Sequence, residues 1–427
     1  MVCVSVKKDG NIMGLKKEQD NDKRNLLIVN TFMQVVFCFF TVFFSVYVYD
    51  ISKDFNIVML YTLTYVLSVL VLTAIIRRFI NRKMMSVLFR ISFVLCLCST
   101  VLTFFISIER IWLVFIIQIL YATTCVFYYL ASEIGAMYKN HKGNMKQFNG
   151  LNSFVAVFAA VLSPILSGYL IDFLSIYVLL GIMIVCVVIS FFFASKIKFS
   201  NNEIEHVKLK EFFSVARKDR AVRYGYVGYA LKRFSQDGPL DRILPILLFL
   251  RTGQNYGVGI YSAIAALVAG VALLIYVYYC KNSKIALWLC SAFQMLTSIL
   301  LLISGSVVCF FIYYFVKHIT YKLITNDMLS SVFVLVNHTQ LHKYKVEHYY
   351  LIVTSSNLSL VISCVLGMII YNCFNGVISM SILIAVYSVI LLLSTFFMTK
   401  SDDELKNLVD YDQLQISGTE IKNKTEQ

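Results

Sequence analysis

The feature that most constrains this chain is a series of long apolar runs separated by short polar segments. About 20 largely apolar residues are needed to cross the hydrocarbon core of a bilayer as an α-helix. Because lipid offers the backbone no hydrogen-bond partners, each run must satisfy its own backbone groups as a helix. Twelve such runs occur, at residues 25–49, 55–76, 85–107, 111–132, 150–171, 175–195, 224–250, 256–280, 285–304, 307–333, 349–371 and 376–399. The pattern predicts an all-α polytopic membrane protein with twelve transmembrane helices.

Composition agrees with this prediction and argues against a soluble globule. The 427 residues are 59% apolar and 15% charged, whereas a soluble domain has about 45–50% apolar and about 25% charged residues. The first apolar run is longer than the core of a secretory signal peptide and lacks a small-residue cleavage pattern. We therefore expect it to be the first membrane span.

The polar segments divide the chain into five parts. They predict a cytoplasmic N-terminal segment, an N-terminal six-helix bundle, a cytoplasmic linker, a C-terminal six-helix bundle and a cytoplasmic tail, at residues 1–24, 25–195, 196–222, 223–399 and 400–427. If the N-terminus is cytoplasmic, 29 of the 38 Lys and Arg residues lie on that side, and only Lys53, Arg110 and Arg251 lie in the opposite loops. This positive-inside bias predicts a multi-pass cell-membrane protein with both termini in the cytoplasm. It also accounts for the net charge of +14 without nucleic-acid binding.

Two stretches carry a resemblance to a known family. The loop from Ala74 to Lys83 is similar to the basic loop between helices 2 and 3 of the major facilitator superfamily, with matches at Arg82 and Lys83. The fifth run, with Pro164 and Gly168, resembles the Pro-Gly stretch of facilitator helix 5, where small residues allow close helix packing. An ordinary proline kink is the alternative explanation of that stretch. The linker segment 207–223 looks like the amphipathic helix that joins the halves in this family.

The resemblance implies two pseudo-symmetric six-helix bundles and alternating access around a site at the bilayer midplane. It makes the chain a divergent member of that superfamily and a secondary transporter. It implies no enzymatic activity. Cysteine and histidine spacings typical of metal sites do not occur in the sequence, so we expect no metal and no other cofactor.

Charged residues inside the seventh run are the strongest functional signal. A charge at a helix centre costs about 2.5–3.5 kcal/mol on insertion scales, so such residues are functional candidates. Arg233, Asp237 and Asp241 recur every four residues, which predicts one shared helix face and an Arg233–Asp237 pair. Gly238-Pro239 follows directly and predicts a helix break. Omitting this run would leave eleven spans, which the positive-inside bias disfavours.

The tenth run carries a second polar group at similar depth. We expect Lys317 to contact Asp237. The two runs hold more basic residues than acidic ones: the bases are Lys232, Arg233, Arg242, Lys317 and Lys322, and the acids are Asp237, Asp241 and Asp327. Arg90 of the third run adds another base. Excess positive charge in a low-dielectric cavity attracts an anion. Two alternatives remain: a neutralising network that locks the bundles together, and charges that extend to the headgroups. The predicted substrate- or ion-binding residues are Lys232, Arg233, Gln236, Asp237, Asp241, Lys317, His318, Tyr321, Lys322, Gln34, Gln118 and Tyr121.

These observations predict a monomeric secondary transporter for a small anionic organic solute, coupled to a proton or sodium gradient. Asp237, Asp241 and His318 are the titratable candidates for proton coupling, although His318 equally fits a packing role. A multidrug or amphiphile exporter is one alternative, favoured by 34 Phe and 27 Tyr residues. A non-transporting membrane receptor or assembly factor on a facilitator scaffold is the other.

Overall fold

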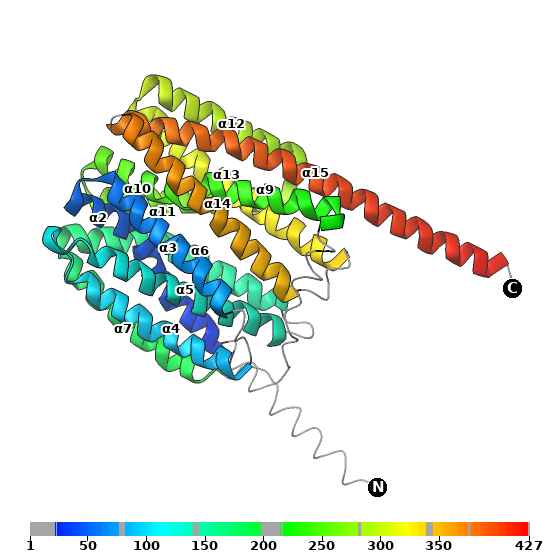
Figure 1. Ribbon diagram of the computed structural model, residues 1–427, viewed down its shortest axis with the longest axis horizontal. Helices are drawn as coiled ribbons and strands as arrows, with labels where there is room; N and C mark the ends of the chain where they lie inside the picture. The colour runs from blue at the N-terminus through cyan, green and yellow to red at the C-terminus, as the bar shows by residue number, and fades with distance from the viewer. Residues whose placement is uncertain are drawn as a thin grey trace, which may run out of the picture. The chain divides into compact units, whose positions relative to one another are not determined.

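The computed structural model consists of α-helices with short connections (Figure 1). It describes residues 22, 24–76, 82–139, 145–197, 214, 217–280, 283–338, 345–374 and 376–425. Most of the predicted linker helix at 207–223, and the centre of the loop between Ala74 and Lys83, lie outside the described residues.

The helices pack into two compact units. Unit 1 comprises residues 1–205 and 241–267, and unit 2 comprises residues 206–240 and 268–427. This grouping differs from a division by chain order, because residues 241–267 pack with the N-terminal helices. The predicted bundle boundaries, 25–195 and 223–399, stay a prediction.

Unit 1 begins with a helix over Arg24–Ser52 that contains a π-helical turn, η1 (Phe39–Phe43), followed by α2 (Phe44–Ser52). Helix α5 packs against α3 and α4, and α4 packs against α7. The remaining N-terminal elements are α3 (Phe55–Ile76), α4 (Arg82–Thr103), the 3₁₀ turn η2 (Ile108–Arg110), α5 (Leu113–Lys139), α6 (Met145–Phe173) and α7 (Ile176–Ser195).

In unit 2, α9 packs against α14 and α15, and α12 packs against α13 and α15. Helices α10 and α11 each contribute residues to both units. The elements of this half of the chain are α9 (Arg220–Gln236), α10 (Pro239–Thr252), α11 (Asn255–Tyr279), α12 (Ser283–Ser304), α13 (Val307–His338), α14 (Lys345–Cys373) and α15 (Gly376–Thr425).

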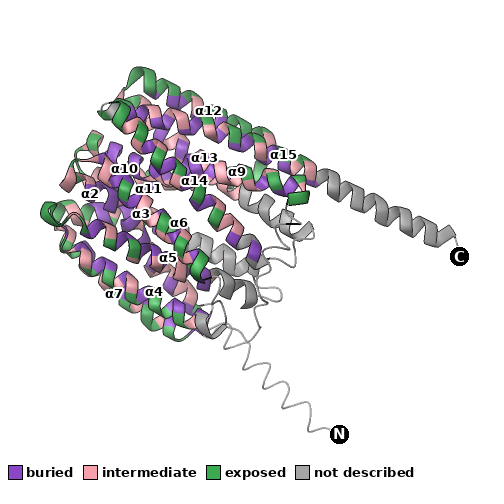
Figure 2. Cartoon of the chain, in the orientation of Figure 1, coloured by how far each residue is buried: buried purple, intermediate pink, exposed green. Residues whose placement is uncertain are grey.

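Among the residues that the structure describes, ten helices are long and apolar enough to cross a membrane, and each coincides with a predicted span. The fifth run lies in α6, of which Phe158–Phe173 is the apolar stretch among the described side chains. The seventh run forms α9 and α10. The prediction of an all-helical, multi-pass membrane protein is confirmed. Figure 2 shows exposed residues in green along α7 and α12. The exposed apolar residues of these two helices include Val185, Phe192, Leu289 and Phe293, as expected of residues that face lipid.

The prediction that Arg233, Asp237 and Asp241 share one helix face is wrong for Asp241. Helix α9 ends at Gln236, Asp237 is extended with φ −105° and ψ −179°, and α10 starts at Pro239. Gly238 has a φ of +65°, which glycine adopts without a side-chain clash. Asp241 therefore lies on a separate helix and belongs to unit 1. The break itself was predicted from Gly238-Pro239 and is confirmed.

The small residues of the fifth run bring two backbones together, as predicted. A Cβ atom on Gly168 would lie 2.5 Å from the Asn255 carbonyl oxygen, and one on Gly259 would lie 2.3 Å from the Pro164 carbonyl oxygen. Helices α6 and α11 thus approach closely within unit 1. Asp172 at the end of α6 accepts hydrogen bonds from the Asn255 Nδ2 (2.8 Å) and the Tyr256 backbone nitrogen (2.6 Å), capping α11.

Candidate functional site

The break between α9 and α10 positions Asp237 as the C-cap residue of α9. Its backbone nitrogen still donates to the Arg233 carbonyl at 3.2 Å, so the last turn of α9 is closed. Proline is well suited to the first turn of a helix, where its missing N–H is not needed, so Pro239 starts α10 directly after Gly238. The sequence Asp-Gly-Pro therefore places a carboxylate at a helix end inside the apolar segment.

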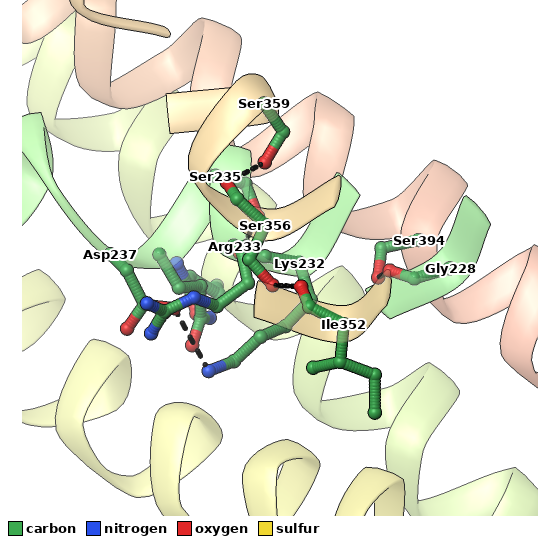
Figure 3. A network of polar contacts seen from close by, with 11 residues as sticks. Gly228, Lys232, Arg233, Ser235, Asp237, Ile352, Ser356, Ser359 and Ser394 are labelled. Atoms are coloured by element: carbon green, nitrogen blue, oxygen red, sulfur yellow. Dashed lines mark hydrogen bonds and ion pairs between the residues drawn. The ribbon is translucent and has the colours of Figure 1, made fainter. Parts of the chain in front are cut away.

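Two cations of α9 converge on this carboxylate. The Lys232 Nζ and the Arg233 Nη1 each lie 3.1 Å from the Asp237 Oδ2, and Figure 3 shows both side chains directed at it. The side chains of Lys232 and Asp237 are 3% and 5% exposed, whereas that of Arg233 is 30% exposed. The predicted Arg233–Asp237 pair is confirmed. Arg233 is the most exposed of these three side chains.

Helix α13 adds a third cation. Lys317 is buried and lies close enough to Asp237 for their charges to interact, whereas a direct Lys317–Asp237 contact stays a prediction. The Lys232 Nζ and the Lys317 Nζ lie 4.3 and 5.0 Å from the ring centroid of Tyr321, so both ammonium groups face this ring. We call Lys232, Arg233, Asp237, Lys317 and Tyr321 the cationic cluster. Within this set, three cations accompany one carboxylate.

A buried amide pair adjoins the cluster. The Gln236 Nε2 donates to the Gln294 Oε1 at 2.9 Å, and both side chains are fully buried. Gln236 was a predicted site residue, but its partner on α12 was not identified from the sequence. The only hint in the sequence was that Gln294 is a polar residue inside the ninth apolar run. The hydrophobic periodicity of one helix does not show which other helix such a residue contacts.

Serine hydroxyls hold α9 in place. The Ser363 Oγ of α14 donates to the Phe234 carbonyl at 2.9 Å, and the Ser394 Oγ of α15 donates to the Gly228 carbonyl at 2.8 Å. The Ser394–Gly228 contact is visible in Figure 3. These interhelical bonds fix the segment that carries Lys232 and Arg233.

The remaining predicted residues of unit 2 have other surroundings. His318 is half-buried, its Nδ1 lies 2.8 Å from the Tyr314 carbonyl oxygen, and its ring centroid lies 4.4 Å from that of Tyr314, which fits the packing role. Lys322 is half-buried on α13. Asp327, counted among the acids of the tenth run, accepts a hydrogen bond from the Tyr276 hydroxyl at 3.0 Å.

The other predicted residues lie in unit 1. The Tyr121 ring stacks on Phe40 at 4.3 Å and lies 5.7 Å from Tyr65. Gln118, one turn earlier on α5, is fully buried, and neither of its amide atoms has a hydrogen-bond partner in the described part of the chain. Gln34 and Asp241 are half-buried.

Two bases that were counted toward a common cavity lie in unit 1 instead. The Arg90 side chain is exposed and its Nη2 donates to the Ser195 carbonyl at 3.2 Å, so it belongs to the α4–α7 contact. Arg242 is buried, and its Nη1 donates to the Phe40 and Thr41 carbonyls. Sequence could not reveal this arrangement, because the carbonyl acceptors come from a π-helical turn 201 and 202 residues earlier in the chain.

No group of three or more His, Cys, Asp or Glu side chains that could hold a metal ion occurs among the residues that the structure describes.

Solved structures establish the type of fold. No protein-family model matches the chain, and no curated protein matches its sequence. The chain is similar to a bacterial metal transporter with a TM-score of 0.61 and 14% identity, over 90% of this chain and 98% of that one. It is similar to the nucleoside transporter NupG with a TM-score of 0.66 and 10% identity, over 89% and 99%. It also resembles the peptide transporter POT in complex with sulfate, with a TM-score of 0.65 and 11% identity, over 91% and 95%. Nearly the whole length of three transporters is thus matched, and the chain has the fold of the major facilitator transporters.

Proposed function

We propose that this protein is a secondary transporter that moves a small organic anion by alternating access. The fold supports the general activity, because its neighbours are transporters over nearly their full length. Those neighbours are named for metals, nucleosides and peptides. A shared fold does not choose among such solutes, since function resides in the site.

The observation that carries the choice of an anion is the charge excess of the cationic cluster. Lys232 and Arg233 pair with Asp237, the charge of Lys317 interacts with the same carboxylate, and both lysines are buried. Excess charge is expensive to bury in a low-dielectric interior, and a bound anion would relieve that cost. The partial exposure of Arg233 supports approach of the solute from its side of the cluster.

The orientation and energy source belong to this proposal as well. The positive-inside distribution supports cytoplasmic termini in the cell membrane. Transport is coupled to a proton or sodium gradient. The cationic cluster binds the anion, and Asp237 is the buried carboxylate of that cluster. Gln34, Gln118 and Tyr121 of unit 1 stay predicted binding residues.

Uptake into proteoliposomes tests the proposal. We expect uptake of at least one member of a panel of radiolabelled organic anions by the wild type, and a loss of roughly tenfold or more with Lys317→Met, since about 1.4 kcal/mol of lost binding energy already gives a factor of ten. The matched control is Lys53→Met, which removes a lysine from an exposed pair with Asp50. Wild-type uptake of amphiphilic cations without anions would support an exporter instead. Absence of any flux from correctly folded protein would support the non-transporting scaffold.

A further inference from the structure

We propose that Arg242 is a carboxylate-binding residue, which receives a carboxylate attached to a flat apolar or aromatic body. The proposal rests on the proposed function, because it names the chemical class of the anion. It concerns unit 1, and it adds a residue that is absent from the predicted binding set.

One side of the Arg242 guanidinium is anchored to the backbone. Its Nη1 donates to the Phe40 carbonyl at 2.5 Å and to the Thr41 carbonyl at 3.0 Å. Both carbonyls belong to η1, where the wider π-helical spacing disturbs the usual backbone ladder. Backbone oxygens can therefore serve as acceptors for a side chain inside the membrane segment. This anchor fixes the plane and direction of the guanidinium.

The other edge of the guanidinium makes no hydrogen bond or ion pair with the described part of the chain. Arg242 is 7% exposed, and in the described part of the chain neither its Nε nor its Nη2 has a hydrogen-bond or ion-pair partner. The Nε–Nη2 edge is a planar pair of donors that matches the two oxygens of a carboxylate. The hydrogen bonds of this buried cation go to neutral carbonyl groups, which do not neutralise its charge. A bound carboxylate would accept hydrogen bonds from Nε and Nη2 and would also neutralise the guanidinium.

Aromatic side chains lie near the guanidinium. The Arg242 Cζ lies 5.8 Å from the ring centroid of Tyr61, and the Tyr121 ring stacks on Phe40, whose carbonyl accepts a hydrogen bond from Arg242. A phosphate dianion is better matched by several cations, whereas one guanidinium in an aromatic setting suits a single carboxylate charge with an apolar body. Aromatic monocarboxylates fit this combination of contacts.

The test is ligand binding to the purified full chain, measured by thermal shift and isothermal titration with benzoate, benzamide and phenyl phosphate. We expect benzoate to stabilise the wild type, benzamide to have no effect and phenyl phosphate to bind more weakly than benzoate. Arg242→Lys should weaken benzoate binding by roughly tenfold or more, because an ammonium lacks the planar donor pair. The matched control, Arg223→Lys at an exposed position of α9 in unit 2, should bind benzoate within about twofold of the wild type, because it makes the same exchange outside the proposed site. Absence of benzoate binding to the wild type, or equal binding by Arg242→Lys, would overturn the proposal.

A second variant covers the case in which Arg242→Lys does not fold. Tyr121→Leu removes part of the aromatic surroundings, and it should weaken benzoate binding more than acetate binding. Equal losses for both would overturn the proposal. Failure of the proposed function gives a different result: benzoate would bind in an Arg242-dependent manner, yet proteoliposomes would take up no anion. Uptake that depends on Lys317 but not on Arg242 would reject the Arg242 site alone.

Discussion

The two units of this molecule compensate buried positive charge in different ways. In unit 2, Lys232 and Arg233 pair with the Asp237 carboxylate, and Lys317 adds a further charge. In unit 1, Arg242 is held by backbone carbonyls and lies over the ring of Tyr61. A carboxylate neutralises one full positive charge, so removing it is expected to destabilise the cations that pair with it. Carbonyl dipoles fix orientation but leave the net charge in place, so a bound carboxylate would complete this second arrangement.

The largest effect should come from removing the carboxylate of unit 2. Asp237→Asn removes the anion that Lys232 and Arg233 share, and breaking a buried pair in this way costs about 3–5 kcal/mol. We expect a corresponding fall in the free energy of unfolding in detergent, together with loss of anion uptake. The control is Asp50→Asn in the exposed Lys53–Asp50 pair, where the cost should stay below about 1 kcal/mol. Equal costs in the two variants would show that the cationic cluster is not a coupled site.

The membership of Lys317 in the cluster can be measured by a double-mutant cycle. The double variant of Lys317→Met and Asp237→Asn should lose less stability than the two single variants summed, with a coupling of about 0.5–3 kcal/mol. The physical reason is that each single change alters the charge balance of the cluster, whereas the double change removes one charge of each sign. Additive effects would place Lys317 outside the electrostatic cluster and would weaken the contrast between the units.

Glycine contacts offer a comparison that does not involve charge. Gly168→Ala in unit 1 would direct a Cβ into the backbone of Asn255, and overpacking of this kind costs about 1–3 kcal/mol. Gly228→Ala in unit 2 would meet the flexible Met398 side chain, so a smaller loss is expected. Gly181→Ala has no atom within 4 Å of its Cβ and should be neutral or slightly stabilising. Thermal unfolding of the three variants gives the order, and a different order would contradict the close α6–α11 approach.

The smallest effect should come from the cap of α11. Asp172→Ala removes acceptors for the Asn255 side chain and the Tyr256 backbone nitrogen, which should cost about 0.5–2 kcal/mol. Hydrogen exchange at the first turn of α11 measures this locally, and we expect faster exchange there than in α7. Asp172→Asn retains one acceptor oxygen and should lose less. Unchanged exchange in Asp172→Ala would mean that the cap does not stabilise α11.

Much of the fold and part of the site could be predicted from residue patterns. Spans such as 55–76 and 175–195 agree closely with α3 and α7, because each is a continuous apolar run with polar ends. The Arg233–Asp237 pair was predictable since both residues lie about one helical turn apart. The break after Asp237 was predictable because Gly238 and Pro239 each disturb a helix in a known way.

Other features could not be obtained in this way. Asp241 was placed on the same face as Asp237, but the break changes the direction of the chain between them. Arg242 was counted with the charges of unit 2, although its acceptors lie on the π-helical turn of unit 1. Gln294 pairs with Gln236 across two helices, and periodicity along one helix does not contain that information.

Residue patterns specify where the chain is helical and which helices carry ionised groups, because hydrophobic run length, glycine, proline and charge act over one or a few turns. Which of those groups meet depends on the packed fold, because the partners of a buried side chain depend on how separate helices pack. Asp237 pairs with cations that the chain supplies four and five residues away, whereas Arg242 finds its acceptors 201 and 202 residues away. The first kind of contact is a property of local order, and the second is a property of the packed molecule.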